Sequence, residues 1–484
     1  MDTHHPRQGR RALVIGGSMS GLVGARVLSG AFDEVIVLER DAFPDGDVVN
    51  RAGVPQAWHH HVLLSRGRDI LTGLFPGLDR RMDDAKIPTI DYGRDAALIS
   101  RVGELKRFES KVMIRPCRRG TLDRLVLEEL RQVPNVTIHE KARVEGLETT
   151  TDSRGRIRVV GLKVTMKDAQ GKPKASILAG DLVVDASGSR SYAPKWLSQL
   201  GFDVPEEEVV DADLGYASCL YEPSPDHTRD WKVIGITTRP PTNPRAAGLW
   251  QVENGQWMCS LIGTSGHHPP SDPEGFLEFA RQLPDPRIYE FLKTAKPMTK
   301  IRAYRGTKNR WRHYESMRSF PAGMVTLGTT LCSYNPLYGQ GMTAVAEQAL
   351  VLGEHVAKRL RSGRSFDASF ARRFHKAIAR TVRLPWTLAT LEDWRWSTTT
   401  GKRPGAWMTV ANSYIDRVLP LATHDEDVAL AILNVMNMQV NPAVLGTPDM
   451  LSKYVKTFVP QMPQKRMRSQ SDVPRDVYQR ETLS

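Results

Sequence analysis

The residues best suited to chemistry lie in the segment 328–342, GTTLCSYNPLYGQGM. Pro336 fixes its own φ, and Gly339 and Gly341 let the backbone approach a flat ligand closely. The apolar run 324–327 before the segment predicts a buried strand. A helical pattern follows the glycines, and the free N–H groups of its first turn would favour an anionic group at the same place.

The helix predicted after these glycines has one apolar face and ends at Gly363. The apolar positions are Met342, Val345, Ala349, Leu352, Val356 and Leu360. A reduced isoalloxazine ring carries negative charge at its N1–C2=O edge, so it suits a helix N-terminus of this kind. The pattern alone supports two interpretations, a flavin site or a tight structural loop.

A second ligand-binding pattern stands near the start of the chain. The apolar run 12–15 is followed by Gly16, Ser18 and Gly21, which approximate G-x-G-x-x-G with serine in the second glycine position. The next predicted strand, 34–38, ends before Glu39. This order predicts a dinucleotide-binding turn, with a pyrophosphate at the helix N-terminus and the acid at a ribose hydroxyl.

Two further strand ends carry polar or small residues. The predicted strand 112–114 leads through Arg119 into a helix, where the arginine would hold a phosphate or else be a solvated charge. The predicted strand 182–184 ends at Asp185 and Gly188. This is a second small-residue turn after a buried strand.

The pattern changes to antiparallel β between about 205 and 300. Strands are predicted at 233–237, 248–252 and 257–262, and Asn-Gly at 254–255 predicts a hairpin between the last two. Trp250 and Trp257 would form one wall of an apolar pocket or belong to the ordinary core. Beyond 364 the chain is helical and amphipathic, and the polar tail 461–484 is predicted to be disordered.

Three adjacent histidines occupy 59–61. Neighbouring side chains point in different directions, whereas metal ligands are usually spaced along one face, so we expect no metal here. One of the three lining a ligand pocket is the better interpretation, and His60 is the candidate.

Composition limits the class of protein. The chain has 484 residues, 40% hydrophobic and 25% charged, which is ordinary for a globular protein of two or three domains. Its net charge of +13 comes from scattered Lys and Arg, so no nucleic-acid partner is expected. Four cysteines without a CxxC pair indicate a reducing compartment.

Targeting signals are weak. No apolar stretch of signal-peptide length precedes the first strand, and the longest uncharged run, 428–448, contains Asn, Gln and Pro. We therefore expect a cytoplasmic protein with at most a peripheral membrane contact.

In chain order, GGSMSGL with Glu39, the Arg119 junction, DLVVDASG and GTTLCSYNPLYGQGM resemble the FAD-dependent monooxygenases of the para-hydroxybenzoate hydroxylase fold. The segments RAGVPQAWHHHVLL, VVDASGSRS and WRHYESMRSFPAGMVTLGTTLCSYNPLYGQGM are most similar to squalene epoxidase and the bacterial polyene epoxidases of polyether biosynthesis. The similarity covers most of residues 10–440. Its motifs are specific for FAD and the fold, and much less so for substrate.

The resemblance implies an α/β fold: a Rossmann-type FAD-binding domain, an inserted antiparallel β-sheet substrate domain and a C-terminal helical region. The expected FAD-binding segments are 1–75, 110–205 and 300–365. The substrate domain would take 76–109 and 206–299, and the helical region 366–460. The resemblance implies that the cofactor-binding residues are Gly16, Ser18, Gly21, Glu39, Arg119, Asp185, Gly188, Gly328, Thr329, Pro336, Gly339, Gln340, Gly341 and Met342.

One residue departs from the family pattern. The family usually has Gly-Asp where this chain has Gly328 and Thr329, and that Asp binds the ribityl chain of the cofactor. A threonine hydroxyl still forms a hydrogen bond but lacks the strength of a charged acceptor. The resemblance therefore implies weaker retention of FAD. Tyr338, beside the glycines, and His60 are the pocket candidates.

The chemistry implied by the cofactor is monooxygenation. NAD(P)H would reduce the flavin directly or through a flavin reductase, because no second dinucleotide fingerprint occurs. O2 would add at C4a, and the distal oxygen of that hydroperoxide is electrophilic. An alkene needs only positioning and a dry pocket, whereas a phenol needs a base.

The predicted activity is epoxidation of an alkene in a lipophilic polyketide or terpenoid, in secondary metabolism such as antibiotic biosynthesis. Aromatic hydroxylation is an alternative. A related halogenase or alkene reductase is another, although the Trp-x-Trp-x-Ile-Pro motif of halogenases is absent. A degenerate flavoprotein without catalysis is a third alternative, and Thr329 is its best support.

Overall fold

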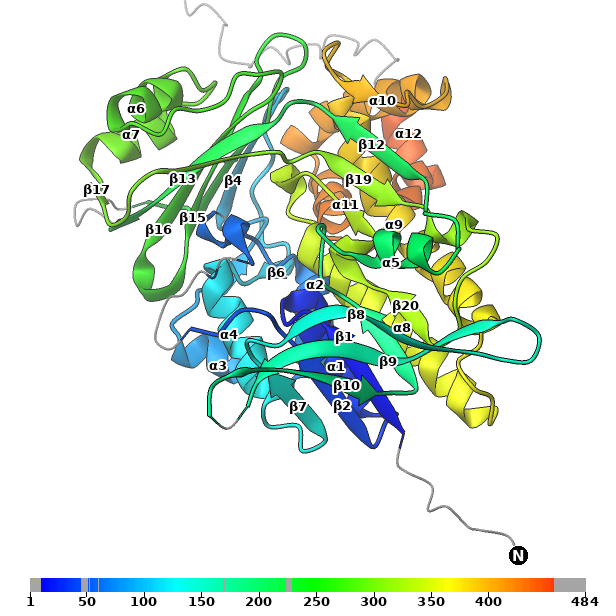
Figure 1. Cartoon of the computed structure of the whole chain (residues 1–484). Helices are drawn as coiled ribbons and strands as arrows, with labels where there is room; N and C mark the ends of the chain where they lie inside the picture. The colour runs from blue at the N-terminus through cyan, green and yellow to red at the C-terminus, as the bar shows by residue number, and fades with distance from the viewer. Residues whose placement is uncertain are drawn as a thin grey trace, which may run out of the picture.

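A computed structural model describes residues 10–44, 51, 53–59, 61–168, 170–222 and 229–456. Its centre is a five-stranded parallel sheet in the order β20-β11-β1-β2-β7 (Figure 1). These strands are β1 (Arg11–Ile15), β2 (Glu34–Leu38), β7 (Val136–His139), β11 (Leu182–Asp185) and β20 (Met324–Thr326). The middle strands are continuous apolar runs because both faces of the sheet are covered.

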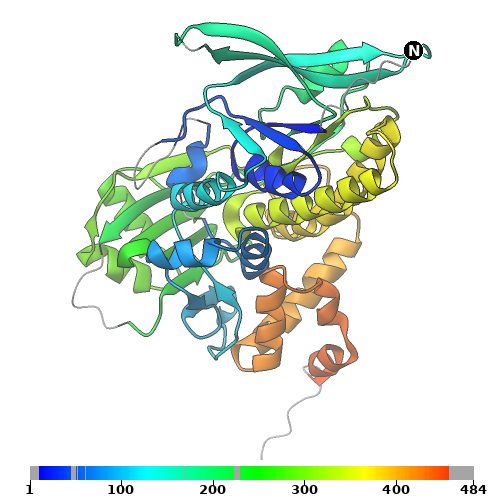
Figure 2. The same ribbon diagram turned by 90° about the horizontal axis from the view of Figure 1, so that it is seen from below.

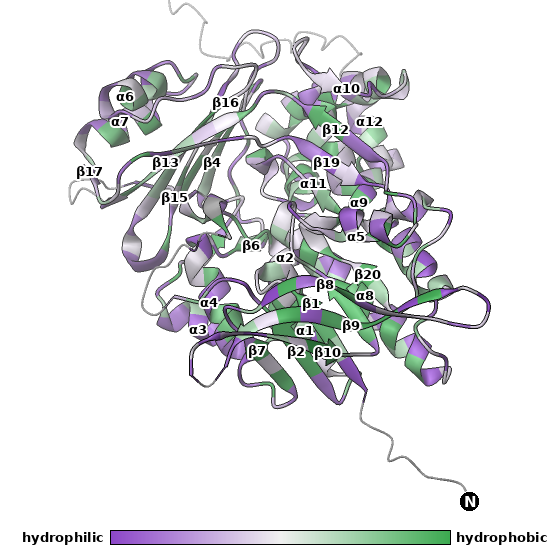
Figure 3. Cartoon of the chain, in the orientation of Figure 1, coloured by the Kyte–Doolittle hydropathy of each residue, from purple (hydrophilic) through white to green (hydrophobic). Residues whose placement is uncertain are grey.

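Helices cover one face of this sheet and a small sheet covers the other. The helices are α1 (Met19–Ser29), α4 (Arg119–Leu130) and α8 (Gly341–Arg361). The small antiparallel sheet has the order β10-β9-β8, from strands β8 (Arg143–Thr151), β9 (Ile157–Lys167) and β10 (Pro173–Ala179). Figure 2 shows these layers edge-on. In Figure 3 green, apolar stretches of ribbon gather around β1, β2 and β20.

An eight-stranded sheet forms the second large layer. It contains β4 (Ala96–Ser100), β5 (Gly103–Glu104), β13 (Gly215–Glu222), β14 (Val233–Ile236), β15 (Arg245–Gln251), β16 (Trp257–Gly263), β17 (Lys296–Pro297) and β18 (Arg302–Arg305). Only the β4–β14 pair in it is parallel. Helices α6 (Pro273–Arg281) and α7 (Arg287–Thr294) pack their phenylalanines on its outer face.

The predicted hairpin joins β15 and β16 through residues 252–256, and Asn254 and Gly255 in this connection both have positive φ. The two tryptophans of the hairpin lie on opposite faces. Trp250 faces the inner side, whereas Trp257 packs with Trp231 and Phe291 in the outer core. Of the two alternatives that the sequence left open, Trp250 follows the first and lines the cavity, whereas Trp257 follows the second and belongs to the core.

The C-terminal region is helical, as predicted. It consists of α9 (Ala368–Asp393), α10 (Trp407–Val418), α11 (Glu426–Met436) and α12 (Pro448–Lys456). Both views place α10–α12 at the end of the molecule opposite the β8–β10 sheet (Figures 1 and 2). In the described part of the chain, no helix combines the length and apolarity needed to cross a bilayer. The predicted disordered tail, 461–484, lies outside the described residues.

Smaller elements connect these layers. A four-stranded sheet contains β12 (Glu207–Asp211), β19 (Asn309–Arg312), β21 (Cys332–Ser333) and β22 (Thr400–Gly401). Strands β3 (Ile90–Asp91) and β6 (Met113–Ile114) form a pair. The remaining helices are α2 (Ser65–Leu74), α3 (Leu78–Asp84) and α5 (Ala193–Gln199). The short 3-10 turns are η1 (Pro55–Trp58), η2 (Glu253–Gly255), η3 (Tyr314–Ser316), η4 (Gly328–Thr330), η5 (Pro336–Tyr338), η6 (Leu419–Thr423) and η7 (Pro442–Gly446).

The segment 76–109 divides between two layers. Helix α3 packs into the core around the parallel sheet through Leu78 and Met82, while β4 and β5 join the eight-stranded sheet. The predicted domain boundaries therefore remain a prediction.

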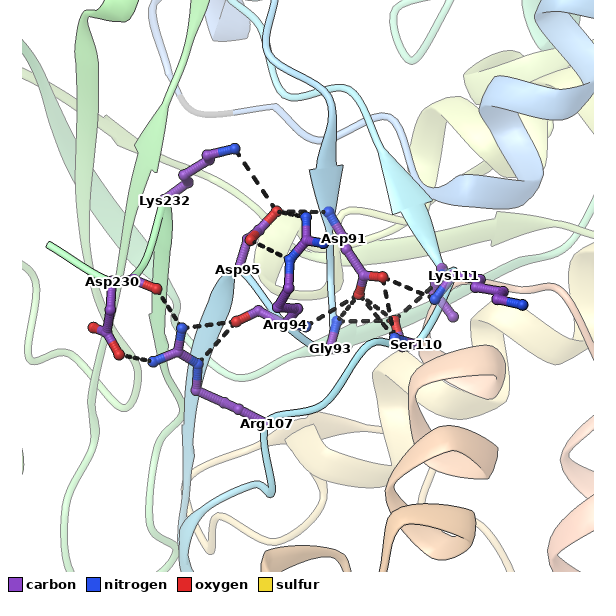
Figure 4. Close-up of polar contacts among 10 residues, drawn as sticks. Asp91, Gly93, Arg94, Asp95, Arg107, Ser110, Lys111, Asp230 and Lys232 are labelled. Carbon is purple, nitrogen blue, oxygen red and sulfur yellow. Dashed lines mark hydrogen bonds and ion pairs between the residues drawn. The ribbon is translucent and has the colours of Figure 1, made fainter.

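A buried carboxylate holds the turn that leads into β4 (Figure 4). Asp91 accepts hydrogen bonds from the backbone N–H groups of Gly93 at 2.9 Å, Arg94 at 3.0 Å and Lys111 at 2.9 Å, and from the Ser110 hydroxyl at 2.6 Å. Burial alone would raise the pKa of Asp91, but the bonds from Ser110, Arg94 and Lys111 hold this pKa below its ordinary value.

Candidate functional site

A cavity of about 660 Å³ lies between the glycine turns of the parallel sheet, the eight-stranded sheet and helices α9–α11. Its sheet wall is apolar, with Leu98, Ile236, Trp250 and Ile262 among the lining residues. Its helical wall contains apolar residues of α9, α10 and α11. These walls can exclude water from a ligand that is itself largely apolar.

The turn after β1 is compact because two glycines touch. Gly16 has a φ of +100°, and a Cβ on Gly21 would lie 1.7 Å from the Gly16 carbonyl oxygen. Only glycine at position 21 lets α1 pack this closely on the strand end. Ser18 precedes the first residue of α1 and lines the cavity.

Glu39, predicted to bind a ribose, uses its carboxylate for contacts within the protein. Its carboxylate accepts the Gly17 N–H at 2.7 Å and the Asp41 N–H at 2.9 Å. It also pairs with Arg51 at 3.0 Å, and both side chains are buried. Glu39 is not among the cavity-lining residues, so its ribose contact stays a prediction.

Arg119, the first residue of α4, lines the cavity. Its guanidinium donates to Asp123 at 2.8 Å and to the Ser18 hydroxyl at 3.4 Å. The neighbouring Arg118 turns away and bonds Glu253 instead. The structure therefore joins Arg119 with the first glycine turn, where an anion would meet both a cation and a helix N-terminus.

Asp185 has no exposed surface and serves the turn that follows it. Its carboxylate accepts from the Ser187 backbone N–H at 2.9 Å and from the hydroxyls of Ser187 and Ser191, both at 2.5 Å. Burial raises the pKa of Asp185. Gly188, with a φ of +92°, donates its N–H to the Thr330 hydroxyl at 2.9 Å, which ties this turn to the 328–330 turn.

Gly328 needs to be glycine for two reasons. Its φ is +71°, and a Cβ would lie 2.1 Å from the Ser20 hydroxyl. Its N–H donates to Gln348 at 2.8 Å. Thr329 follows it, is half-buried and lines the cavity beside Ser18 and Ser20.

The loop 335–341, called the ring loop below, forms the cavity wall at the start of α8. Asn335 caps its 3-10 turn by accepting the Leu337 N–H at 3.2 Å, and Gly339 has a φ of +64°. A Cβ added to Gly341 would meet no atom of the described residues within 4 Å. The space in front of this helix start is therefore open to the cavity.

The other ring-loop candidates also line the cavity. They are Pro336, Tyr338, Gln340 and, just after the loop, Met342. The Gln340 side-chain oxygen is buried with no hydrogen-bond partner among the described residues. Burial raises the pKa of the Tyr338 phenol, and the charges of Glu392 and Asp393 add to the effect, so the phenol is neutral.

The histidine that lines the cavity is His61. The candidate His60 lies outside the described residues. The His61 Nδ1 lies 2.9 Å from the His59 carbonyl oxygen and therefore carries the proton. Burial and then the charge of Arg119 lower the pKa of His61 to about 3, so its imidazole is neutral at neutral pH. His59 bonds Ser218 at 3.0 Å. No group of three possible metal ligands occurs among the described residues.

Two charged residues that the sequence motifs do not include also line the cavity, one on α9 and one directly after β4. Glu392 of α9 and Arg101 line the cavity next to Tyr338. Arg101 lies 3.4 Å from Glu392 and 2.5 Å from Asp416, and Arg395 bridges the same two carboxylates. Contacts between residues some 290 positions apart leave no local signal in a sequence.

The residues present fit an FAD molecule. The open space at Gly341 suits a flat ring, and the Gln340 side-chain oxygen is an acceptor without a partner among the residues that the structure describes. Of the predicted cofactor residues, the cavity brings together Ser18, Arg119, Thr329, Pro336, Gly339, Gln340, Gly341 and Met342. The others, Gly16, Gly21, Glu39, Asp185, Gly188 and Gly328, shape the surrounding turns without lining the cavity. The individual cofactor contacts stay predictions.

One curated protein is similar along most of the chain. Protein Rv3254 of Mycobacterium tuberculosis is 31% identical over 424 residues, which are 86% of each chain. No family model matches the chain.

Solved structures share the fold at low sequence identity. A flavoprotein/dehydrogenase from Cytophaga hutchinsonii has a TM-score of 0.64 at 16% identity, covering 93% of this chain and 99% of its own. PqsL, a probable FAD-dependent monooxygenase from Pseudomonas aeruginosa, has a TM-score of 0.56 at 16% identity, covering 80% and 97%. The flavin-dependent brominase Bmp2 has a TM-score of 0.58 at 13% identity, covering 92% and 99%. The predicted fold class is thereby confirmed.

Proposed function

We propose that this chain, which belongs to the family of Protein Rv3254 of Mycobacterium tuberculosis, is an FAD-dependent monooxygenase. The fold it shares with flavin-dependent proteins and the cavity at Gly341 support this proposal. Ser18 and Arg119 would hold the phosphates, Thr329 the ribityl chain, and Gly341 would lie against the ring. A bound flavin supplies an electrophilic oxygen atom derived from O2 once NAD(P)H, directly or through a flavin reductase, has reduced it.

The substrate we propose is an alkene in a lipophilic polyketide or terpenoid. A phenol must lose its proton to a base, and the described cavity lining offers no good one. The His61 imidazole has a pKa lowered to about 3 by burial, and the carboxylate in the lining, Glu392, is held by Arg101 and Arg395. An alkene needs only position and the exclusion of water. This lack of a base is the observation that carries the proposal.

Residues of the cavity lining would position the alkene and exclude water. Trp250, Ile236 and Ile262 offer an apolar surface for the substrate, and the helical wall closes it from water. The neutral Tyr338 phenol can donate one hydrogen bond to a polar group of the substrate. The Arg101–Glu392 ion pair beside Tyr338 offers a charged contact for the same polar group of the substrate.

The assay that tests the proposal supplies FAD, NADPH, O2 and a lipophilic polyene, with and without a flavin reductase. We expect a product heavier by one oxygen atom, formed only with O2. Its requirement for the reductase shows whether NADPH acts directly. If no polyene in a panel stimulates NADPH oxidation or gives product, while phenols do both, the activity is aromatic hydroxylation and not epoxidation. Protein that stays colourless after FAD soaking would instead indicate a degenerate flavoprotein.

Thr329→Asp is expected to tighten FAD binding. Thr329 lines the cavity, and a carboxylate there accepts a ribityl hydroxyl more strongly than a threonine hydroxyl does. A charge-assisted bond contributes about 1 kcal/mol more than a neutral one, which is several-fold in affinity. The gain should appear as slower FAD loss. Flavin fluorescence titration with Thr329→Asn as an uncharged control checks it, and equal or weaker binding by the Asp variant would contradict the ribityl role.

A further inference from the structure

A buried carboxylate at the end of α9 holds the ring loop from outside the cavity lining. Both oxygens of Asp393 accept from the Asn335 amide, at 2.9 and 2.8 Å. The Asn309 amide donates to the same carboxylate at 2.5 Å. Asp393 is 4% exposed, and Asn309 is fully buried.

Asn335 connects this carboxylate to the loop. Its backbone N–H donates to the Asn309 side-chain oxygen at 2.7 Å, and its own side-chain oxygen caps the Leu337 N–H. Each polar group of the Asn335 side chain therefore has a partner. The next residue, Pro336, already lines the cavity. The orientation of Asn335, and with it the start of the ring loop, depends on Asp393.

One carboxylate oxygen of Asp393 accepts from both the Asn309 and Asn335 amides, and the other lies 2.9 Å from the Asn335 amide as well. An ionised carboxylate accepts at both oxygens and donates at neither, and its charge strengthens each of these bonds. Protonation removes that charge and turns one oxygen into a donor. The ionised form of Asp393 is therefore the form that binds the two asparagines most strongly.

We propose that Asp393 is a positioning residue for the flavin site, which sets the conformation of the ring loop through Asn335. The inference rests on the proposed function, because the ring loop matters to chemistry only where a flavin binds. The flavin motifs of the sequence do not include any residue of α9.

The ionisation of Asp393 falls in an accessible pH range. Burial raises the pKa of Asp393 to about 7, the bonds from Asn335 and Asn309 lower it, and the charges of Glu392 and Asp211 raise it again. Tyr338 also faces Asp393, and Arg101 and Arg395 lie near that tyrosine. The folded pKa is above the unfolded one, so the stability contribution of Asp393 falls as pH rises from about 4 to 7. Over the upper part of that window, the fraction of molecules with a fully held ring loop rises.

The test is FAD titration between pH 6 and pH 8, combined with amide hydrogen exchange of residues 331–342 in the FAD-free protein. Wild-type protein is expected to bind FAD several-fold more tightly at pH 8 than at pH 6. Asp393→Asn keeps the size but has one acceptor oxygen, so its affinity at pH 8 should be about tenfold lower and independent of pH. The 331–342 segment should exchange faster in that variant.

Asp367→Asn is the matched control, because Asp367 caps the other end of α9 and pairs with Arg359. It weakens the same helix without touching the ring loop, so it should keep the wild-type pH profile. Equal affinity, equal pH dependence and equal exchange in wild type and Asp393→Asn would overturn the inference while leaving the proposed function standing. If wild-type protein binds no FAD at any pH, the proposed function fails and the inference fails with it.

Discussion

Gly341→Leu is expected to leave the protein folded and to weaken FAD binding by about fivefold to 150-fold. A Cβ at this position meets nothing within 4 Å, so a side chain there enters the cavity without displacing the protein's own atoms. It would occupy the space proposed for the flavin ring, and forcing side chain and ring together costs about 1–3 kcal/mol. That cost is about fivefold to 150-fold in affinity. Flavin fluorescence titration measures it.

Gly73→Leu provides the control for this variant. Gly73 lies in α2, and a Cβ there also meets nothing within 4 Å, but the position is exposed and outside the cavity lining. Both variants should unfold near the wild-type temperature, and only Gly341→Leu should lose FAD. Undiminished FAD binding by Gly341→Leu would show that the ring lies elsewhere.

Asp91→Ala is expected to lower the free energy of unfolding by about 3–5 kcal/mol, the usual cost of removing one partner from a buried charged network. Asp91 is 2% exposed, and its removal leaves the Arg94 and Lys111 N–H groups and the Ser110 hydroxyl without this acceptor, while the Gly93 N–H keeps only its bond to Ser110. Urea unfolding at pH 7 measures the loss. Because the folded pKa of Asp91 is lowered, its contribution is present above the unfolded pKa and disappears as pH falls through the folded one.

Asp152→Ala is the control that tests whether the loss of stability comes from the burial of Asp91 or from the number of hydrogen bonds it accepts. Asp152 also accepts two backbone N–H groups and pairs with an arginine, Arg156, but it lies on an exposed turn. Water replaces its bonds when they are lost, so a much smaller change is expected. Equal effects of the two substitutions would mean that the Asp91 turn contributes no more to stability than an exposed one.

The parallel sheet could be predicted because its signals are local. Strands β1, β11 and β20 contain apolar runs that end at glycine or small polar residues, and the Asn-Gly hairpin is equally local. Strands β8 and β10 were missed because they alternate or are largely exposed, so no apolar run marks them. The sequence left open whether Trp250 and Trp257 line a pocket or belong to the core, because the pairing across the hairpin decides which face of the sheet each side chain occupies. The pairing of Trp250 with Met258 puts Trp257 opposite Gln251, on the other face.

The candidate site also contains residues that local motifs predict and residues that they do not. Ser18, Thr329 and Gly341 stand in motifs with fixed spacing, and the cavity contains all three. A run of three histidines gave no basis for choosing among its members, since a one-residue difference reverses the direction of a side chain. Arg101, Glu392 and Asp393 could not have been found, because their partners come from distant parts of the chain and only the folded arrangement brings them together.

The late position of α9–α11 in the chain has a consequence for how this protein can diversify. Every glycine turn proposed to hold the flavin precedes residue 362, whereas one whole wall of the cavity comes from the contiguous stretch 388–445. Insertions or substitutions in that single stretch reshape the volume facing the ring loop while leaving the cofactor turns intact. Glu392 and Asp393 lie where this stretch contacts the cofactor-binding part of the cavity. Sequence changes are therefore least constrained beyond them, in α10, α11 and η7.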